Sequence, residues 1–298
     1  MTASFVRRIR WHAYRTPLGG LVKSIKSLGA GAELARRRAF LAQLPHDDEI
    51  EVAAAELNRF GFVRLDHIAN RGVIEQLQAA TDASRGRGDK QAMDTFASNK
   101  GGLWEHAIDS AMIDGRLDAG SAFTRAAMQP RILSVVAHAL GALPRLDYVT
   151  VTDSKPMLGE PAYSQLWHLD YDDVRVIKFF IYLTDVETVE DGPFTFLPGP
   201  VSDRIGFSIK SHRRDEQMPP HVQLARDVVR VTGPRYSCFM VETTRCQHMG
   251  SRVAPGHSRL MYTSTFFVPP RMYPEPKPFF LPTGSESELE RAILLAGG

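Results

Sequence analysis

The spacing of hydrophobic residues changes once along the chain. In the first half, apolar residues recur every three or four positions, which is typical of amphipathic helices. Asp47 or Asp48 provides an N-cap for one such stretch, and Gly61 ends it. The same spacing predicts a helix over residues 72–83 and a helical zone over 121–140, which Pro130 restarts. We therefore expect the first half of the chain to be mainly helical.

After residue 144 the period shortens to that of strands. Residues 146–152 (LDYVTVT) alternate and are rich in β-branched and aromatic side chains, which predicts a strand. Further strands are expected over residues 174–184, 228–231, 236–241 and 260–268. Helices followed by many short strands favour a mainly β, α+β protein, in which a jelly-roll barrel has a helical layer packed outside it.

The pattern also predicts the domain organisation. A basic helical N-terminal extension is expected over residues 1–45, and one domain over residues 46–298. The jelly-roll core of this domain is expected to cover about residues 144–270. A C-terminal helix follows over about residues 285–296, in which Ser285 and Glu288 have the spacing of a capping box.

Positive charge is concentrated near the N-terminus. Residues 1–40 contain nine arginines and lysines but one acidic residue, although the whole chain has a net charge of +2. One interpretation is an arm that contacts an anionic membrane surface or an anionic partner. The other is a solvated helical extension that packs on the main domain. The remainder of the chain is acidic, so nothing supports nucleic-acid binding, and the oligomeric state is left open.

Composition favours a cytoplasmic protein. The apolar content of 43% and charged content of 23% are those of an ordinary globular domain. No apolar run is long enough to cross a bilayer, and the N-terminus has no clear signal-peptide pattern. The two cysteines, Cys238 and Cys246, do not form a disulfide framework. We expect a cytoplasmic location, with membrane association if the basic arm contacts lipid.

The segment QLWHLD contains the most informative residues of the chain. His168 and Asp170 are two positions apart, so in a strand both side chains point to the same face. His248, eighty residues downstream, would complete a ligand set from a neighbouring strand. Two imidazoles and one carboxylate with open coordination positions are the ligands of non-haem Fe(II) oxygenases, although they select only weakly against Mn, Co, Ni or Zn.

An arginine at a fixed offset adds to this set. Arg259 follows His248 by eleven residues, and its planar fork of donors suits the far carboxylate of 2-oxoglutarate. Lys178 and Tyr182 lie four apart on one predicted strand, so they share a face and line a pocket if that face is the barrel interior.

These residues stand in two blocks, 164–200 and 245–267, that resemble the phytanoyl-CoA dioxygenase family of Fe(II)/2-oxoglutarate oxygenases. The resemblance extends over about residues 50–270. It implies a double-stranded β-helix with the metal at its mouth, and Fe(II), 2-oxoglutarate and O2 as metal, cosubstrate and oxidant. His168, Asp170 and His248 match the metal ligands of the family, and Arg259 matches the arginine that pairs with 2-oxoglutarate.

Two further positions refine the resemblance. Pro200 is a departure, since relatives often have Ser-His after the Pro-Gly turn, but it lies outside the metal set. Asp170 is present where related halogenases have a small residue that leaves room for chloride. The resemblance therefore implies a hydroxylase or desaturase.

Four other residues are candidate contacts of the cosubstrate. Lys155 lies where relatives often place a residue that reaches 2-oxoglutarate, and Gln165 and Thr263 are rival neutral partners. Trp167 flanks a ligand and is a candidate wall of the cosubstrate pocket. The alternative for Lys155 is a solvated charge at a strand end, and for Trp167 it is ordinary packing.

The function expected from the sequence is that of a dioxygenase. It would hydroxylate or desaturate an unactivated C–H bond of a small-molecule, lipid-linked or sugar-linked substrate and release succinate and CO2. Two alternatives remain: a catalytically idle metal-binding scaffold, and a cupin-like Zn or Mn enzyme, which would not need Arg259. Nothing in the sequence identifies the substrate.

Overall fold

A computed structural model describes most of the chain. The described residues are 17–86, 104–106, 108, 111–156, 159–206, 212–250, 252–272 and 279–295. Residues 1–16, the first part of the predicted basic extension, lie outside them.

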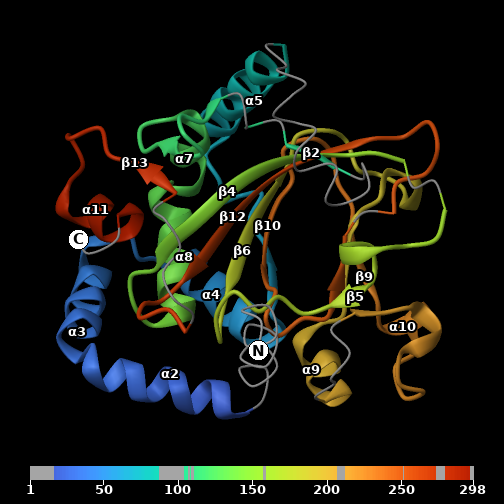
Figure 1. Cartoon of the computed structure of the whole chain (residues 1–298), viewed down its shortest axis with the longest axis horizontal. Helices are drawn as coiled ribbons and strands as arrows, with labels where there is room; N and C mark the ends of the chain where they lie inside the picture. The colour runs from blue at the N-terminus through green and yellow to red at the C-terminus, as the bar shows by residue number, and fades with distance from the viewer. Residues whose placement is uncertain are drawn as a thin grey trace, which may run out of the picture.

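Two antiparallel sheets face each other in the centre of the molecule (Figure 1). The larger sheet has the order β1 (Phe62–Arg64), β10 (Cys238–Glu242), β6 (Ile177–Tyr182), β12 (Arg259–Phe267), β4 (Arg145–Ser154) and β2 (Trp104–His106). The smaller sheet has the order β8 (His212–Arg213), β5 (Trp167–His168), β11 (His248–Met249), β7 (Phe194–Phe196) and β9 (Val229–Val231).

The order of these strands identifies a double-stranded β-helix. From β4 to β7, and again from β9 to β12, the chain alternates between the two sheets, so that β4, β6, β10 and β12 lie in the larger sheet and β5, β7, β9 and β11 in the smaller one. This confirms the predicted fold class. Each strand that the alternating pattern predicts is present, with ends within a few residues of the expected positions.

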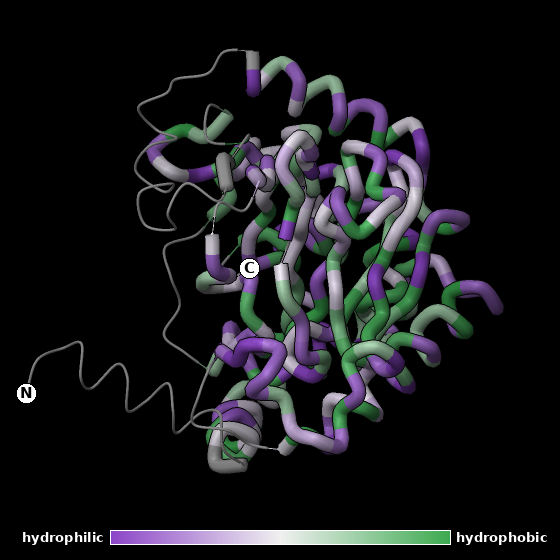
Figure 2. The backbone as a smooth tube through the Cα atoms, turned by 90° about the vertical axis from the view of Figure 1, so that its right-hand side faces the viewer, coloured by the Kyte–Doolittle hydropathy of each residue, from purple (hydrophilic) through white to green (hydrophobic). Residues whose placement is uncertain are grey.

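Side chains on the two faces of the larger sheet have different surroundings. Inward-facing Phe180, Tyr182 and Met261 pack with aromatic residues of β7 and β10 inside the barrel. Their neighbours Ile181 and Tyr262 point outward and pack against helices. Figure 2 colours the backbone by hydropathy and shows hydrophobic segments, in green, among the central strands. The barrel interior and the layer beneath the helices are therefore two separate cores.

Helices cover the outer face of the larger sheet (Figure 1). They are α4 (Asp48–Phe60), α5 (Arg71–Gly86), α7 (Ala122–Ala127) and α8 (Pro130–Leu140). Asp47 caps α4 by accepting a hydrogen bond from the Ile50 amide at 3.0 Å. The predicted helical zone over 121–140 is divided, because Pro130 starts a second helix there.

Further helices lie at the two ends of the described chain. At the N-terminal end are α2 (Pro17–Gly29) and α3 (Gly31–Ala39), and at the C-terminal end is α11 (Glu288–Leu294). Buried Arg37 of α3 pairs with Glu33 at 2.6 Å and donates to the carbonyl of Ala292 at 2.8 Å, which joins α3 to α11. Among the described residues, no helix combines the length and apolarity required to span a membrane.

The capping box predicted for the C-terminal helix is wrong by two residues. Ser287 accepts from the Glu290 amide, and the Glu290 carboxylate accepts from the Ser287 amide at 2.7 Å. Glu286 instead accepts from the backbone of Thr283 and Gly284 in the preceding turn, at 2.5 and 3.1 Å. Glu286 therefore caps the turn that precedes the helix, and the helix itself begins at Glu288, later than expected.

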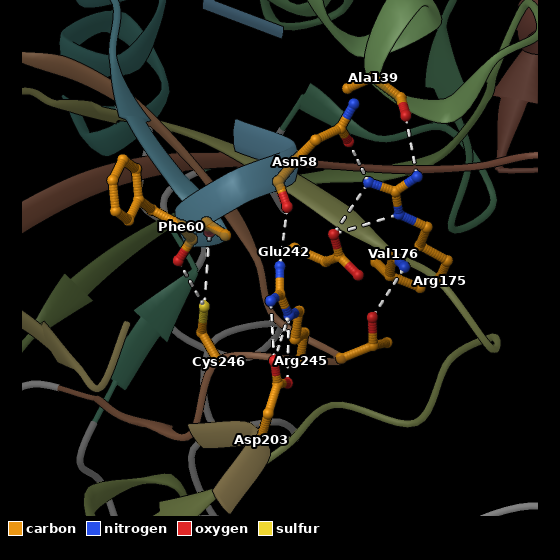
Figure 3. Close-up of polar contacts among 11 residues, drawn as sticks. Asn58, Phe60, Ala139, Arg175, Val176, Asp203, Glu242, Arg245 and Cys246 are labelled. Carbon is orange, nitrogen blue, oxygen red and sulfur yellow. Dashed lines mark hydrogen bonds and ion pairs between the residues drawn. The ribbon is translucent and has the colours of Figure 1, made fainter. Parts of the chain in front are cut away.

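Two arginines hold the end of α4 against the barrel (Figure 3). Arg175 donates to Glu242 at 3.0 Å, to the Asn58 side chain at 2.6 Å and to the Ala139 carbonyl at 2.8 Å. Arg245 donates to Asp203 at 2.7 Å and to the Asn58 carbonyl at 2.8 Å. Arg175 thus connects the ends of α4 and α8 with β10, and Arg245 connects the end of α4 with the segment between β10 and β11.

Gly61 provides a test of this junction. Gly61 and Gly141 end α4 and α8 with φ of 74° and 73°, so alanine at either position costs about 1–2 kcal/mol of backbone strain. A Cβ at Gly61 would lie 2.3 Å from Cys246 Sγ, whereas at Gly141 nothing lies within 4 Å. We expect Gly61→Ala to lower the free energy of unfolding by about 1–3 kcal/mol more than Gly141→Ala. Urea unfolding of both variants measures this, and equal losses would contradict the packing of Gly61 on Cys246.

Candidate metal centre

Two neighbouring strands bring three candidate ligands together. His168 of β5 and His248 of β11 are directly paired in the smaller sheet, and Asp170 follows β5. The Nε2 atom of His168 lies 3.9 Å from Asp170 Oδ1, and that of His248 lies 3.8 Å from Asp170 Oδ2. All three ligand atoms lie within 4.8 Å of one another. They surround a space of the size that one metal ion requires.

Backbone carbonyls fix the orientation of both imidazoles. His168 Nδ1 lies 2.8 Å from the carbonyl of Leu166, and His248 Nδ1 lies 2.9 Å from the carbonyl of Cys246. A carbonyl oxygen only accepts, so each Nδ1 carries the proton and donates it. Each Nε2 then presents its lone pair to the cluster, which is the tautomer that a metal ligand needs.

Electrostatics keep the three side chains ready for a metal. Burial lowers the pKa of His168 to about 4 and lowers that of His248 as well, so both rings are neutral at neutral pH. Burial alone would raise the pKa of Asp170, but the adjacent charge of Lys178 outweighs it and holds this pKa well below its usual range. The set therefore offers two neutral imidazoles and one carboxylate.

Lys178 of β6 also adjoins the site. Its spacing from Tyr182 predicted only that the two side chains share one face of the strand. Its Nζ lies 2.8 Å from Asp170 Oδ2 and 3.9 Å from Asp172 Oδ2. Burial lowers the pKa of Lys178, but Asp170, Tyr148 and Asp172 raise it by more, so this side chain is a cation. The signal in the sequence was a lysine inside an apolar strand, but its partner could be found only in three dimensions.

His212 also adjoins the site, although its spacing gave no reason to expect this. It lies opposite His168 across the β5–β8 pair, and the two rings stack with centroids 5.0 Å apart. His212 is itself exposed, and its ring covers one face of the His168 ring.

Arg259 is a buried cation at the start of β12. It is 2% exposed, its Nη1 donates to the Gly192 carbonyl at 2.6 Å, and its Nη2 lies 3.5 Å from Ser154 Oγ. Its Nε has no hydrogen-bond partner, and no carboxylate of the described residues forms an ion pair with it. Burial lowers the pKa of Arg259, and nearby Tyr182 opposes this. A buried charge without a counter-ion is costly, so the surroundings of Arg259 suit an anionic ligand.

The four other candidate residues lie in different environments. Thr263, 8% exposed, shares the inward face of β12 with Arg259. Lys155 forms an ion pair with Asp153 at 3.1 Å. The Gln165 side chain is buried and accepts from the Ala162 amide at 3.2 Å.

Trp167 points to the opposite side of β5 from His168. It packs with Leu197 and Met218, and its Nε1 donates to Asp215 at 2.8 Å. A cosubstrate contact by Trp167, like those by Lys155, Gln165 and Thr263, stays a prediction.

Comparisons with known proteins identify neighbours of the fold. No family model matches this sequence, and neither does any curated protein. Apo EctD from S. alaskensis is 17% identical with a TM-score of 0.53, and the match covers 79% of this chain and 84% of EctD. EctD with 2-oxoglutarate and 5-hydroxyectoine is 18% identical, with a TM-score of 0.51 and coverage of 76% and 77%.

A second neighbour is SnoN, described as a non-heme alpha ketoglutarate dependent epimerase from nogalamycin biosynthesis. It is 19% identical, with a TM-score of 0.50 and coverage of 74% of this chain and 81% of SnoN. At these identities the likeness to EctD and SnoN is one of fold.

The candidate ligand set predicts which substitutions weaken metal binding. His168→Ala, Asp170→Ala and His248→Ala each remove one donor, so we expect the affinity for Fe(II) or Co(II) to fall by at least about a hundredfold. His221 is exposed and is absent from the cluster, so His221→Ala should bind metal normally. Anaerobic titration calorimetry measures all four, and normal binding by any of the first three variants would reject that residue as a ligand.

The lowered histidine pKa values predict an unusual pH dependence. Protons compete with the metal only below the pKa of the ligands, which for His168 is about 4. We expect metal affinity to stay nearly constant from about pH 8 to about pH 5.5 and to fall below that, whereas ordinary histidines with a pKa of about 6.5 would lose affinity sooner. Competition with a chelator of known pH dependence tests this. A steep fall beginning near neutrality would contradict it.

Proposed function

We propose that this protein is an Fe(II)- and 2-oxoglutarate-dependent dioxygenase. The observation that carries the proposal is the combination of three converged ligands with a buried arginine that lacks an acidic partner among the described residues. Either feature alone occurs in other proteins. Together they provide a place for the metal and a place for a dicarboxylate inside one barrel.

The donor set fits Fe(II). His168 and His248 would bind it through Nε2, because their Nδ1 protons are engaged by carbonyls, and Asp170 would bind it through a carboxylate oxygen. Three ligands leave further coordination positions open. When bound, Fe(II) with 2-oxoglutarate and O2 supplies the oxidising chemistry, and succinate and CO2 are released.

Arg259 would bind the far carboxylate of 2-oxoglutarate. The carbonyl of Gly192 already fixes one end of its guanidinium, while Nε has no partner. A carboxylate would neutralise the buried charge, and the planar fork would fix the direction of the cosubstrate. Thr263 lies on the same face of β12 and is a further candidate to contact it.

The remaining interior residues would orient the ligands and exclude water. Lys178 holds Asp170 by an ion pair, so this carboxylate is positioned before any metal binds. Aromatic side chains fill the interior next to the site and limit the access of water. They are Phe180, Tyr182, Phe194, Phe196 and Phe239.

Membership of the phytanoyl-CoA dioxygenase family is part of this proposal. It rests on the two sequence blocks that contain His168, Asp170, His248 and Arg259. Asp170 in the ligand set favours hydroxylation or desaturation over halogenation. The substrate is proposed to be a small or lipid- or sugar-linked molecule, and the protein is proposed to act in the cytoplasm.

The two competing functions make different demands on the site. A cupin-like Zn or Mn enzyme has no need for a buried arginine at the position of Arg259. An idle scaffold has no need to keep the ligand tautomers and Arg259 together. Consumption of 2-oxoglutarate separates all three functions.

Cosubstrate binding and turnover test the proposal directly. We expect the wild-type protein to develop a visible charge-transfer band with Fe(II) and 2-oxoglutarate without O2, and to form succinate when O2 is admitted. His168→Ala should show neither, and His221→Ala should show both. Iron-loaded wild-type protein without a band or succinate would overturn the proposal in favour of a scaffold or another metal enzyme.

Arg259→Met separates cosubstrate binding from stability. Because Arg259 has no buried counter-ion, we expect the variant to unfold within about 1 kcal/mol of the wild type without 2-oxoglutarate. Saturating 2-oxoglutarate with a redox-inert metal should stabilise the wild type by about 3 kcal/mol at a hundred times its Kd, and the variant much less. Thermal unfolding with and without the cosubstrate measures both. Equal stabilisation of the two proteins would reject the role of Arg259.

A further inference from the structure

The helix α2 has two faces of opposite kind, and its charged face is the one that packs on the protein. Lys23 Nζ lies 2.9 Å from Asp173 Oδ2 and donates to the carbonyls of Val268 and Pro270 at 2.7 and 2.5 Å. Lys26 Nζ donates to the carbonyl of Met272 at 2.7 Å. Lysine–backbone contacts therefore attach α2 to the chain segment that follows β12.

The opposite face of α2 is apolar and exposed. Leu21, Ile25 and Leu28 are 58%, 59% and 84% exposed. At 100° per residue they fall within an arc of about 60°, and Lys23 lies on the other side of the helix. Among the described residues, the other exposed large apolar side chains are a pair in α4, Val52 and Phe60, and three in separate segments, Ile113, Val174 and Val189. This apolar stripe, Leu21, Ile25 and Leu28, therefore has no counterpart there.

Positive charge predominates in the chain segment that contains the stripe. Within α2 there is no acidic residue, and residues 17–43 contain five basic residues and one acid, Glu33. Glu33 is already engaged by Arg36 and Arg37 at 3.4 and 2.6 Å. Arg38 is exposed. Lys26 is exposed as a whole residue, although its Nζ contacts the Met272 carbonyl. The amino-acid sequence before α2 adds four more arginines.

We propose that α2 docks the protein on an anionic lipid bilayer. A helix that presents a short aliphatic stripe within a basic segment binds in the plane of the interface, where the stripe enters the acyl boundary and the exposed cations of the segment meet the headgroups. The charge complementarity favours lipid over a neutral partner. A second copy of this chain is disfavoured, because three side chains are a small part of the roughly 800 Å² that each partner of a stable dimer buries.

The position of α2 makes this surface relevant to the barrel. It lies along one edge of the molecule, with one side free of other elements (Figure 1). Lys23 binds Asp173, three residues after Asp170, so the docked helix is attached to the loop that carries a candidate metal ligand. Docking through α2 is independent of the proposed oxygenase function, because it depends only on the charge and exposure of this helix and its neighbours.

Vesicle sedimentation tests the proposal on the full chain. We expect binding to phosphatidylcholine vesicles that contain about 30% phosphatidylglycerol, and little binding to pure phosphatidylcholine. About 0.5 M salt should release most of the bound protein, because it screens the charges. Equal binding to both vesicle types, or binding to neither, would overturn the proposal.

Variants distinguish the stripe from general basic charge. Leu21→Gln, Ile25→Gln and Leu28→Gln together retain helix propensity and charge, and we expect them to weaken vesicle binding by about a hundredfold or more. The matched control is Val52→Gln with Ile113→Gln, which removes apolar side chains that are 64% and 60% exposed elsewhere and should leave binding unchanged.

Two outcomes of the variant experiment would contradict the docking surface. Undiminished binding by the triple variant would assign vesicle binding to basic charge alone. Self-association of the wild type that the triple variant loses, in the absence of vesicle binding, would assign the stripe to a second copy. Circular dichroism of each variant verifies that the helices are retained, and metal binding by the triple variant should equal that of the wild type.

Discussion

The pairing of β5 with β11 is the constraint on which the site depends. Each strand has two residues, and the one directly paired position brings His168 opposite His248 across eighty residues of sequence. Strands this short supply few ladder hydrogen bonds, so other contacts fix them. The amide of Asp170 donates to Thr243 at 3.0 Å, and Arg252 and Trp167 both bind Asp215, at 2.8 Å each. The geometry of the ligands is thus set by contacts around the strands as much as by the strands themselves.

Two buried cations in the barrel, Lys178 and Arg259, have different kinds of partner. Lys178 has Asp170 as its partner, and this pair keeps the carboxylate ionised in an environment that would otherwise raise its pKa. Arg259 has only neutral acceptors among the described residues, the nearest being the carbonyl of Gly192 at 2.6 Å. A fold that retains such a cation gives up stability at that position. The cost is offset when an anion binds, which links the electrostatics of the barrel to its proposed cosubstrate.

Local signals were sufficient to predict most of the fold. The cap at Asp47, the stop at Gly61 and the two-residue period of β4 depend on neighbouring residues, and the structure has all three. The candidate ligands needed more than short-range logic: His168 and Asp170 are two apart, but His248 was assigned through the resemblance of two sequence blocks to a known family. What could not be predicted depends on distant partners. The ion pair of Lys178 with Asp170, the stacking of His212 on His168 and the attachment of α2 through Lys23 each join residues that sequence spacing does not relate.

The orientation of α2 is the reverse of an ordinary surface helix, which buries its apolar face and exposes its charges. The reversal is tolerated because Asp173 and two backbone carbonyls accept the hydrogen bonds that the Lys23 ammonium group would otherwise donate to water. Burial still lowers the pKa of Lys23. Such contacts compensate the lysines but leave Leu21, Ile25 and Leu28 in water. The apolar face of this helix is removed from water only when an apolar partner covers the stripe. Exposed Arg38 in the neighbouring helix favours an anionic surface, so an anionic bilayer interface is the environment that meets the stripe and this cation together.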